Sequence, residues 1–274
     1  MNCLTKEKKI LVLSCLVQGN SLRSTARITG VHRTTILRLL RDIAKKSEKF
    51  TDVIVSNIHT RYVQVDEIWT FVQKKQKRLT LEEQKIGEFG DQYVFVAIDA
   101  ETKLATSYMV GKRDGRTAYS FMQSLSKRIT GRFQLTTDAF KGYLDAVNFT
   151  FGTEVDYAQL KKLYNGNGNG HIREGYSPCD ITGTVPMPIN GKPKSESIST
   201  SYVERQNLTM RMGMRRFTRL TNGFSKKLKN LKCALALHFF YYNFMRIHQT
   251  LRVTPAMESG ITDRLWTWDD LLAN

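Results

Sequence analysis

Hydrophobic residues recur with a helical period over residues 5–18, at the first positions of the chain. Gly19-Asn20-Ser21 then interrupts the pattern, and a short second helix is predicted over 22–29. After the turn Gly30-Val31-His32, a third helix is predicted to begin at Arg33. Two short helices that cross at a tight turn are typical of a helix-turn-helix. We therefore predict an all-α helix-turn-helix domain over 1–46, followed by a polar linker over 47–60.

From residue 61 the hydrophobic pattern changes to that of strands, rich in Val, Ile, Phe and Tyr. Helical patterns then alternate with shorter strand patterns. The predicted strands are 62–72, 93–99, 106–110, 133–137 and a short 154–157, and the predicted helices are 115–129 and 141–148. Three antiparallel strands followed by alternating helix and strand describe a mixed α/β sheet of the ribonuclease-H-like type. This fold class is predicted for a catalytic domain over 61–217.

The segment 164–200 breaks this pattern with a run of Gly, Asn, Pro and Ser, so we predict a flexible insert there. Helical character resumes at Tyr202, and a C-terminal helical region is predicted over 218–274. The helix after Tyr202 is expected to dock on the sheet through Val203, Leu208 and Met212.

Composition points to a polyanionic partner. Hydrophobic residues make up 41% of the chain, enough for a packed core. Lys and Arg number 42 against 25 acidic residues, a net charge of +17, and nucleic acid is the commonest polyanion that such an excess serves. The excess is concentrated in 1–50 and 201–230, which indicates two separate DNA contacts. No apolar stretch is long enough to span a bilayer, so no membrane partner is expected.

Two aspartates lie in predicted strands, at positions that could face a ligand-binding crevice. Asp66 interrupts an apolar strand, a poor place for a charge unless something pairs with it. Because successive side chains point to opposite faces, Asp66 and Glu67 are not expected to face one pocket. Asp138 ends a strand, where α/β proteins bind ligands. An edge-strand charge for Asp66 and a helix N-cap for Asp138 are the alternative interpretations.

A third carboxylate, Glu204, begins the helix that follows the insert. Asn207 and Arg211 lie three and seven residues later, on the same helical face. Such a stripe suits a metal ligand beside a DNA backbone, and the alternative is an ordinary charged face of a surface helix. Arg215 and Arg216 follow, and we predict that they contact DNA together with Asn207 and Arg211.

These three carboxylates match the needs of phosphodiester chemistry. In-line displacement requires two cations about 4 Å apart that hold the attacking and leaving oxygens. Mg²⁺ takes hard oxygen ligands and retains several waters, so three carboxylates suffice. We therefore expect two Mg²⁺ ions, for which Mn²⁺ could substitute. His238 and His248 lie on an apolar helix, where a lone histidine is usually a core residue, and an assisting role for either is left open.

Several ordered motifs resemble those of the insertion-sequence-one family of Asp-Asp-Glu transposases, in the ribonuclease-H-like integrase superfamily. They are Asp66-Glu-Ile-Trp69, Thr137-Asp138-Ala-Phe-Lys-Gly-Tyr143, Val203-Glu204-Arg-Gln-Asn207 with Arg211, Phe224-Ser-Lys-Lys227 and His238-Phe-Phe-Tyr-Tyr-Asn243 with its downstream residues. The resemblance implies that Asp66, Asp138 and Glu204 are the catalytic, metal-binding triad. It also implies that Arg211 is the basic residue downstream of the glutamate.

The third helix is predicted to read DNA. Arg33, Thr34, Thr35 and Arg38 lie in its first turns, the part of a recognition helix that meets base edges in the major groove. Arg and Thr also contact phosphates, so which of them reads sequence is left open. A small three-helix packing unit is the alternative interpretation.

Together these features predict a DNA transposase that binds the ends of its mobile element and catalyses metal-dependent strand cleavage and strand transfer into target DNA. Its expected partners are double-stranded DNA and further copies of the chain, as a homodimer or higher oligomer on DNA. The expected location is the bacterial cytoplasm, at the nucleoid. A non-catalytic helix-turn-helix regulator with an inactive nuclease-like domain, and an RNA-cleaving nuclease of the same fold, are the two alternatives.

Overall fold

The computed structural model describes residues 3–164 and 181–273. Its first three helices are α1 (Lys6–Val17), α2 (Leu22–Thr29) and α3 (Arg33–Ile54). Ser21 caps α2 by accepting a hydrogen bond from the amide of Ser24, and Gly30 ends it with a φ of 69°, a conformation that favours glycine. The predicted helix-turn-helix order of elements is therefore present at the start of the chain.

Helix α3 is longer than the sequence pattern indicated. The prediction of a linker over 47–60 is wrong for its first half, because the helix continues to Ile54 before the short strand β1 (Ile58–His59). Ser47 and Thr51 are buried where α3 packs against α8 (Leu228–Phe240). Phe50 and Ile54 of this half also pack on the core, so the buried side of the helix mixes polar with apolar residues and its hydrophobic signal is weak.

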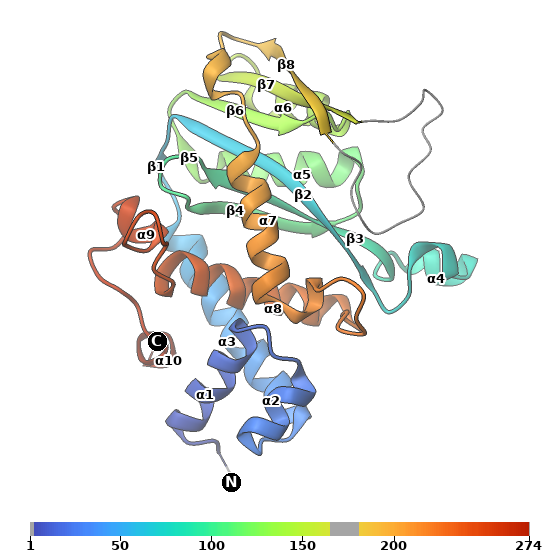
Figure 1. The fold of residues 1–274 in the computed structure, drawn as a ribbon, viewed down its shortest axis with the longest axis vertical. Helices are drawn as coiled ribbons and strands as arrows, with labels where there is room; N and C mark the ends of the chain where they lie inside the picture. The colour runs from blue at the N-terminus through green and yellow to red at the C-terminus, as the bar shows by residue number, and fades with distance from the viewer. Residues whose placement is uncertain (1–2, 165–180, 274) are drawn as a thin grey trace.

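The first and last parts of the chain share one hydrophobic core. Buried residues of α1 and α3 pack with residues of α8 and of the short helices α9 (Pro255–Glu258) and α10 (Trp268–Ala273). Phe50 of α3 lies against Trp266, with ring centroids 4.4 Å apart, and against Phe244 at 5.2 Å. The helix-turn-helix is therefore held firmly against the body of the protein (Figure 1).

A six-stranded mixed sheet forms the centre of the molecule, in the order β4-β3-β2-β6-β7-β8 among the residues that the structure describes. β2 pairs antiparallel with β3, and β3 antiparallel with β4, whereas β2, β6 and β7 run parallel. The sheet strands are β2 (Tyr62–Val72), β3 (Gly90–Asp99), β4 (Ala105–Gly111), β6 (Phe133–Asp138), β7 (Val155–Tyr164) and β8 (Ile181–Asn190), and β5 (Ile129–Thr130) pairs with β1. This arrangement confirms the predicted ribonuclease-H-like α/β fold class.

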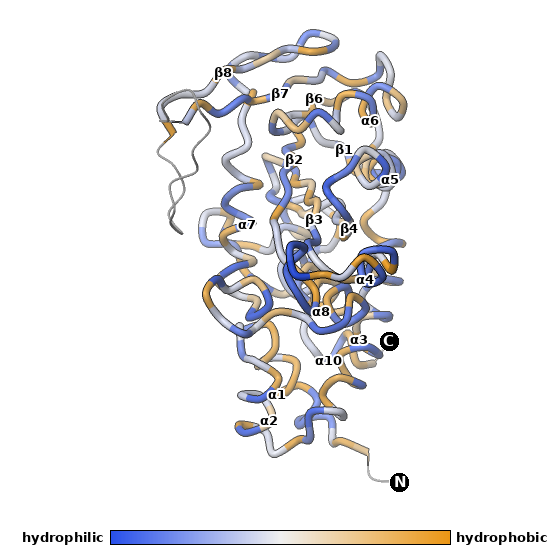
Figure 2. Tube along the Cα trace, turned by 90° about the vertical axis from the view of Figure 1, so that its right-hand side faces the viewer, coloured by the Kyte–Doolittle hydropathy of each residue, from blue (hydrophilic) through white to orange (hydrophobic). Residues whose placement is uncertain are grey.

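Helices cover both faces of the sheet (Figure 1). α5 (Gly115–Ser126) and α6 (Gly142–Phe151) pack on one face, and α7 (Ser201–Gly213) and α8 pack on the other. The remaining short elements are α4 (Leu81–Ile86), the 3-10 helices η1 (Gln76–Arg78), η2 (Ser195–Ser197) and η3 (Arg215–Phe217), and the π-helical segment η4 (Tyr241–Met245). Figure 2 shows from the side that the first helices and the strands β6–β8 lie at opposite ends of the molecule.

Two expectations about residues 164–213 need correction. Part of the predicted flexible insert, 165–180, lies outside the described residues, but 181–190 form strand β8, paired antiparallel with β7. An edge strand tolerates Pro186 and Pro188, which disguised it as a loop. Helix α7 docks through Val203 and Met210, whereas Leu208 and Met212 are 45% and 71% exposed.

None of the described helices is both long and apolar enough to cross a membrane.

Candidate active site

The site forms where strands β2 and β6 separate. Their parallel pairing ends at Val65 and Thr137, and the next residue on each strand is an aspartate, Asp66 on β2 and Asp138 on β6. The two strands are no longer paired beyond this point, at the carboxyl end of β6, and we call this position, where open α/β sheets bind ligands, the crevice. Asp138 accepts a hydrogen bond from the amide of Phe140, but α6 begins only at Gly142, without a side-chain cap. Asp138 is thus not the N-cap of that helix.

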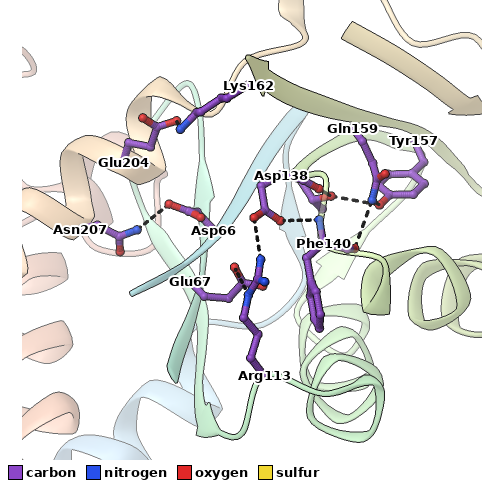
Figure 3. A network of polar contacts seen from close by, with 11 residues as sticks. Asp66, Glu67, Arg113, Asp138, Phe140, Tyr157, Gln159, Lys162, Glu204 and Asn207 are labelled. Atoms are coloured by element: carbon purple, nitrogen blue, oxygen red, sulfur yellow. Dashed lines mark hydrogen bonds and ion pairs between the residues drawn. The ribbon is translucent and has the colours of Figure 1, made fainter. Parts of the chain in front are cut away.

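Three carboxylates meet in this crevice, and the third is one that the sequence argument excluded. Oxygens of Asp66, Glu67 and Asp138 all lie within 4.8 Å of one another (Figure 3). The expectation that Asp66 and Glu67 could not share a pocket is wrong. Asp66 does share the α7 face with Ile68, but β6 no longer pairs with β2 at this level. Side chains from both faces can therefore reach round the free strand edge toward Asp138.

Glu204 lies in the first turn of α7, at the margin of the same site. Its Oε1 forms an ion pair of 2.6 Å with Nζ of Lys162 on β7, and it also accepts a hydrogen bond from the hydroxyl of Thr200. Figure 3 shows the Glu204 side chain directed to Lys162, beside Asp66. Glu204 is not one of the three residues whose ligand atoms cluster within 4.8 Å. The structure thus brings Asp66 and Asp138 together and places Glu204 next to them, held by a cation.

Asn207 connects α7 to the centre of the sheet. Its Nδ2 donates a hydrogen bond of 2.8 Å to Oδ2 of Asp66. Asn207 is only 7% exposed, so it is not a surface group, contrary to the expectation for a direct DNA contact. Its Oδ1 is buried and has no hydrogen-bond partner among the described residues.

Arg113, which sequence reasoning did not single out, joins the two carboxylates on the other side of the crevice. Its guanidinium lies 3.1 Å from Asp138 and 3.6 Å from Glu67, and it stacks 4.3 Å above the ring centroid of Phe140. The Glu67 side chain is almost fully buried, and its Oε1 has no partner among the described residues. Two cations, Arg113 and Lys162, therefore balance part of the charge of four carboxylates.

The crowding of these acids changes their proton affinity. Burial, and then the nearby charge of Asp138, raise the pKa of Asp66 to about 6. Burial and Asp138 also raise the pKa of Glu67, and burial raises that of Asp138. The charge of Glu204 raises the pKa of Asp66 further, which places Glu204 within electrostatic reach of the cluster. The site is thus short of positive charge.

Other candidate groups have structural roles. Asp99 accepts hydrogen bonds from the amide of Glu101 and the hydroxyl of Thr102, the local turn bonding that the sequence indicated. His238 is buried on α8, with neither ring nitrogen bonded to a described residue. Burial, and then the charge of Arg246, lower the pKa of His238 to about 3, so its imidazole is uncharged at neutral pH.

The residues expected to contact DNA fall into two groups. Arg33, Thr34 and Arg38 are exposed at the start of α3, and Thr35 is half-buried there. Arg211 is half-buried on α7, where Asp66 is one of the charges that act on its pKa. The structure places Arg215 and Arg216 in η3, at the end of α7 that faces the helix-turn-helix (Figure 1).

The residues at the crevice fit divalent metal. They offer hard carboxylate oxygens from β2, β6 and α7, the ligand chemistry that Mg²⁺ and Mn²⁺ take. The unpartnered oxygens of Glu67 and Asn207 border the same place. Burial raises the pKa values of Asp66, Glu67 and Asp138, and the charge of Asp138 adds to this at Asp66 and Glu67, so a bound cation would stabilise the ionised carboxylates.

Comparisons with known proteins gave distant structural similarity only. No protein-family model matches the sequence, and no curated protein matches it. Among solved structures, the chain is similar to the Mos1 strand transfer complex, with 14% identity and a TM-score of 0.24 over 57% of this chain and 59% of that one. It is also similar to a piggyBac transposase synaptic complex with hairpin DNA, with 11% identity and a TM-score of 0.37 over 99% of this chain and 72% of that one.

A Mos1 transposase paired-end complex with the left transposon end aligns at 12% identity, with a TM-score of 0.21 over 57% of this chain and 60% of that chain. The chain thus spans about three fifths of the length of the Mos1 chains. None of these comparisons names the insertion-sequence-one family that the sequence motifs resemble. The function proposed below therefore depends on this chain's own residues.

Proposed function

We propose that this protein is a DNA transposase, a metal-dependent polynucleotidyl transferase that cleaves DNA strands at the ends of a mobile element and joins them to target DNA. One observation carries the proposal. Asp66 at the centre of β2 and Asp138 at the end of β6 meet with Glu67 at one crevice, and Glu204 in the first turn of α7 lies at its margin, although Asp66, Asp138 and Glu204 are far apart in sequence. Burying several carboxylates close together is energetically unfavourable. We therefore expect such an arrangement only where a function such as metal binding requires it.

In the proposed mechanism, Asp66, Asp138 and Glu204 hold two Mg²⁺ ions, or Mn²⁺ in their place. When bound, these ions supply Lewis-acid stabilisation of the attacking and leaving oxygens of a phosphodiester. Asn207 fixes the orientation of Asp66 through its hydrogen bond, which makes it a positioning residue rather than a DNA contact. Lys162 and Arg113 keep the side chains of Glu204 and Asp138 in place before metal arrives.

Specific DNA binding is assigned to the first turns of α3. Arg33, Thr34, Thr35 and Arg38 would approach the major groove, and three of them are exposed as this requires. Arg211, Arg215 and Arg216 would contact the phosphate backbone near the catalytic crevice. The proposed division of the chain keeps 1–46 as the DNA-reading unit, 61–217 as the catalytic unit and 218–274 as the helical region that joins them, although α3 runs past the first boundary.

The more specific parts of the proposal rest on the sequence motifs that resemble those of the insertion-sequence-one family. Membership of the insertion-sequence-one family, assembly as a homodimer or higher oligomer on DNA, and action at the nucleoid of a bacterial cytoplasm belong to this proposed function. The complete set of triad carboxylates favours an active enzyme over an inactive regulator. A DNA-reading helix-turn-helix favours DNA over RNA as substrate, because RNA duplexes are recognised by shape.

Strand transfer tests these alternatives together. Purified full-length protein is incubated with a labelled element-end duplex and a supercoiled plasmid, with Mg²⁺, with Mn²⁺, or with a chelator. A transposase joins the labelled end to the plasmid only when metal is present. Binding without cleavage would identify the inactive regulator. In a parallel incubation with labelled RNA, cleavage of RNA but not of DNA would identify the nuclease.

A further inference from the structure

A large cationic cavity separates the helix-turn-helix from the end of α7. Its volume is about 810 Å³, and its wall includes the end of α1, the start of α3, η3, the connection after η3, and α8. Five cations line it, namely Arg23, Arg33, Arg215, Arg216 and Lys226. No Asp or Glu is among the described residues that line it. Apolar side chains make up much of the wall, but every charged side chain in it is positive, which favours anions over cations.

The cations of this cavity also lack partners elsewhere. In the described part of the chain, Arg23, Arg33, Arg215 and Lys226 form no ion pair and no side-chain hydrogen bond. Arg216 donates one hydrogen bond, 2.8 Å long, to the hydroxyl of Ser225. Burial lowers the pKa of Arg216 to about 10, because no carboxylate there compensates the loss of water. Buried guanidinium groups without a counter-ion are costly unless an anion joins them.

The cavity is built by rigid parts of the backbone. Gly19, with a φ of 78°, brings the end of α1 against the end of α7, where an added Cβ would lie 3.2 Å from the carbonyl oxygen of Met212. Gly223 brings the connection after η3 close to Arg215, since a Cβ there would lie 2.4 Å from the carbonyl oxygen of Arg215. Both glycines permit approaches that a larger residue would prevent. The end of α1 therefore lies directly against the end of α7, beside the cavity.

We infer that this cavity binds the phosphate backbone of the DNA duplex whose bases α3 contacts, so that one phosphate site joins the recognition helix to the catalytic helix. The inference rests on the proposed function and adds Arg23 and Lys226 to the residues that contact DNA. Guanidinium groups pair bidentately with phosphate, which makes arginine the residue suited to such a site. The contact is independent of base sequence, because phosphates carry no sequence information.

Helix α7 sets the distance between this phosphate site and the reacting bond. Glu204 and Gly213 lie nine residues apart on α7, which corresponds to about 14 Å at about 1.5 Å per residue. At about 3.4 Å per nucleotide step, this length spans about four base pairs of duplex DNA. A strand that runs along α7 from the cavity would therefore reach the carboxylate crevice within half a helical turn.

The test compares two double variants of the full-length protein for binding of a random-sequence duplex in a chelator, at a series of salt concentrations. Arg23→Gln with Lys226→Gln removes two exposed cations of the cavity. Arg116→Gln with Lys127→Gln, the control, removes two exposed cations at α5 on the opposite face of the sheet. The cavity variant should bind more weakly, with a log–log salt slope shallower by about 1.8, at about 0.9 per lost phosphate contact. Equal binding by both double variants would overturn the inference.

A second measurement identifies the source of the phosphate. Arginine-specific modification by phenylglyoxal, read by mass spectrometry, should be suppressed at Arg215 and Arg216 by the duplex. Inorganic phosphate or a mononucleotide at the same phosphate concentration should not suppress it. Protection by the small anions but not by the duplex would make this a small-anion site and contradict the inference. Neither measurement needs metal or cleavage, so failure of the proposed strand transfer would appear separately from failure of the phosphate site.

Discussion

Asn207 donates a hydrogen bond of 2.8 Å to Asp66, and this single contact joins the face of α7 to the centre of β2 across 141 residues of sequence. Both groups are largely screened from water. A buried hydrogen bond to a charged acceptor is worth more than a neutral one, about 1.5–3 kcal/mol. The position of Glu204, one helical turn before Asn207 on α7, is therefore tied to that of Asp66.

Asn207→Ala should destabilise the metal-free protein by about 1.5–3 kcal/mol, since Asp66 would lose a buried donor. Urea unfolding at pH 7 measures this change. The matched control is Asn148→Ala, at an exposed asparagine of α6, outside the carboxylate site. The same Asn207 variant should bind Mg²⁺ more weakly by about tenfold or more, the usual effect of losing a group that orients a metal ligand. Unchanged stability and metal affinity would remove Asn207 from the positioning role.

Metal-free protein should lose stability as pH rises from about 4 to above 6. The folded-state pKa of Asp66 is raised to about 6 by burial and by Asp138, so its stabilising contribution is complete below the unfolded-state pKa of about 4 and disappears as pH rises through 6. The raised pKa of Glu67 acts in the same direction. Asp66→Asn should therefore be more stable than the parent above pH 7, by up to about 3 kcal/mol, and equally stable near pH 4.

Thermal unfolding with and without Mg²⁺ checks this pH dependence. Added Mg²⁺ should raise the melting temperature of the parent most at high pH, where the carboxylates are ionised, and should have little effect on Asp66→Asn. A stability difference between the two proteins that stays constant from pH 4 to pH 8 would show that the Asp66 carboxylate is not destabilised by its surroundings.

Arg113→Ala should destabilise the protein more at pH 8 than at pH 5. Arg113 is the cation shared by Glu67 and Asp138, and its loss leaves both carboxylates without that counter-charge. Because the Arg113 side chain is 39% exposed, we expect about 1–2 kcal/mol at pH 8. Arg116→Ala, on the first turn of α5, is the control. A loss that is equal at both pH values would mean that Arg113 acts only by packing on Phe140.

The sequence predicted the sheet and two of its site residues because those features are local. Strand periodicity located β2, and an aspartate inside an apolar strand or at the end of one is visible without any partner. Glu67 was missed because the alternation rule gives the face from which a side chain leaves the strand, but not whether it can reach round an edge that is unpaired, as β2 is toward β6 beyond Val65. Arg113 and Lys162 were missed because their roles depend on strand pairing between distant segments.

The errors in the fold have similar causes. Strand β8 was missed because Pro186 and Pro188 imitate a loop, yet an edge strand does not need their amides. The second half of α3 was missed because its buried side mixes the polar residues Ser47 and Thr51 with apolar Phe50, which weakens the local hydrophobic pattern. In both cases packing or pairing with a neighbouring element stabilises the helix or strand, and the local sequence pattern does not show that contact.

Arg38→Ala in the full-length protein should weaken duplex binding and make its salt slope shallower by about 0.9 if the contact is to phosphate. Arg38 is exposed in the second turn of α3, where a recognition helix meets DNA. If Arg38 instead reads a base, the loss should be confined to the element end, at about 1–3 kcal/mol of discrimination. Fluorescence anisotropy with element-end and scrambled duplexes separates these outcomes, and equal binding to the parent on both would exclude Arg38 from the interface.

The most direct test is metal-dependent strand cleavage by the three triad variants, Asp66→Asn, Asp138→Asn and Glu204→Gln. Each removes one ligand charge while keeping the side-chain shape, and Glu196→Gln, an exposed glutamate of η2, is the matched control. With a labelled element-end duplex and Mg²⁺, the parent and Glu196→Gln should cleave at similar rates. Each triad variant should bind the duplex as tightly as the parent and cleave it at least about a hundredfold more slowly. Cleavage at the parental rate by any one of the three would contradict its assignment as a metal ligand, and cleavage by all three would contradict the two-metal site itself.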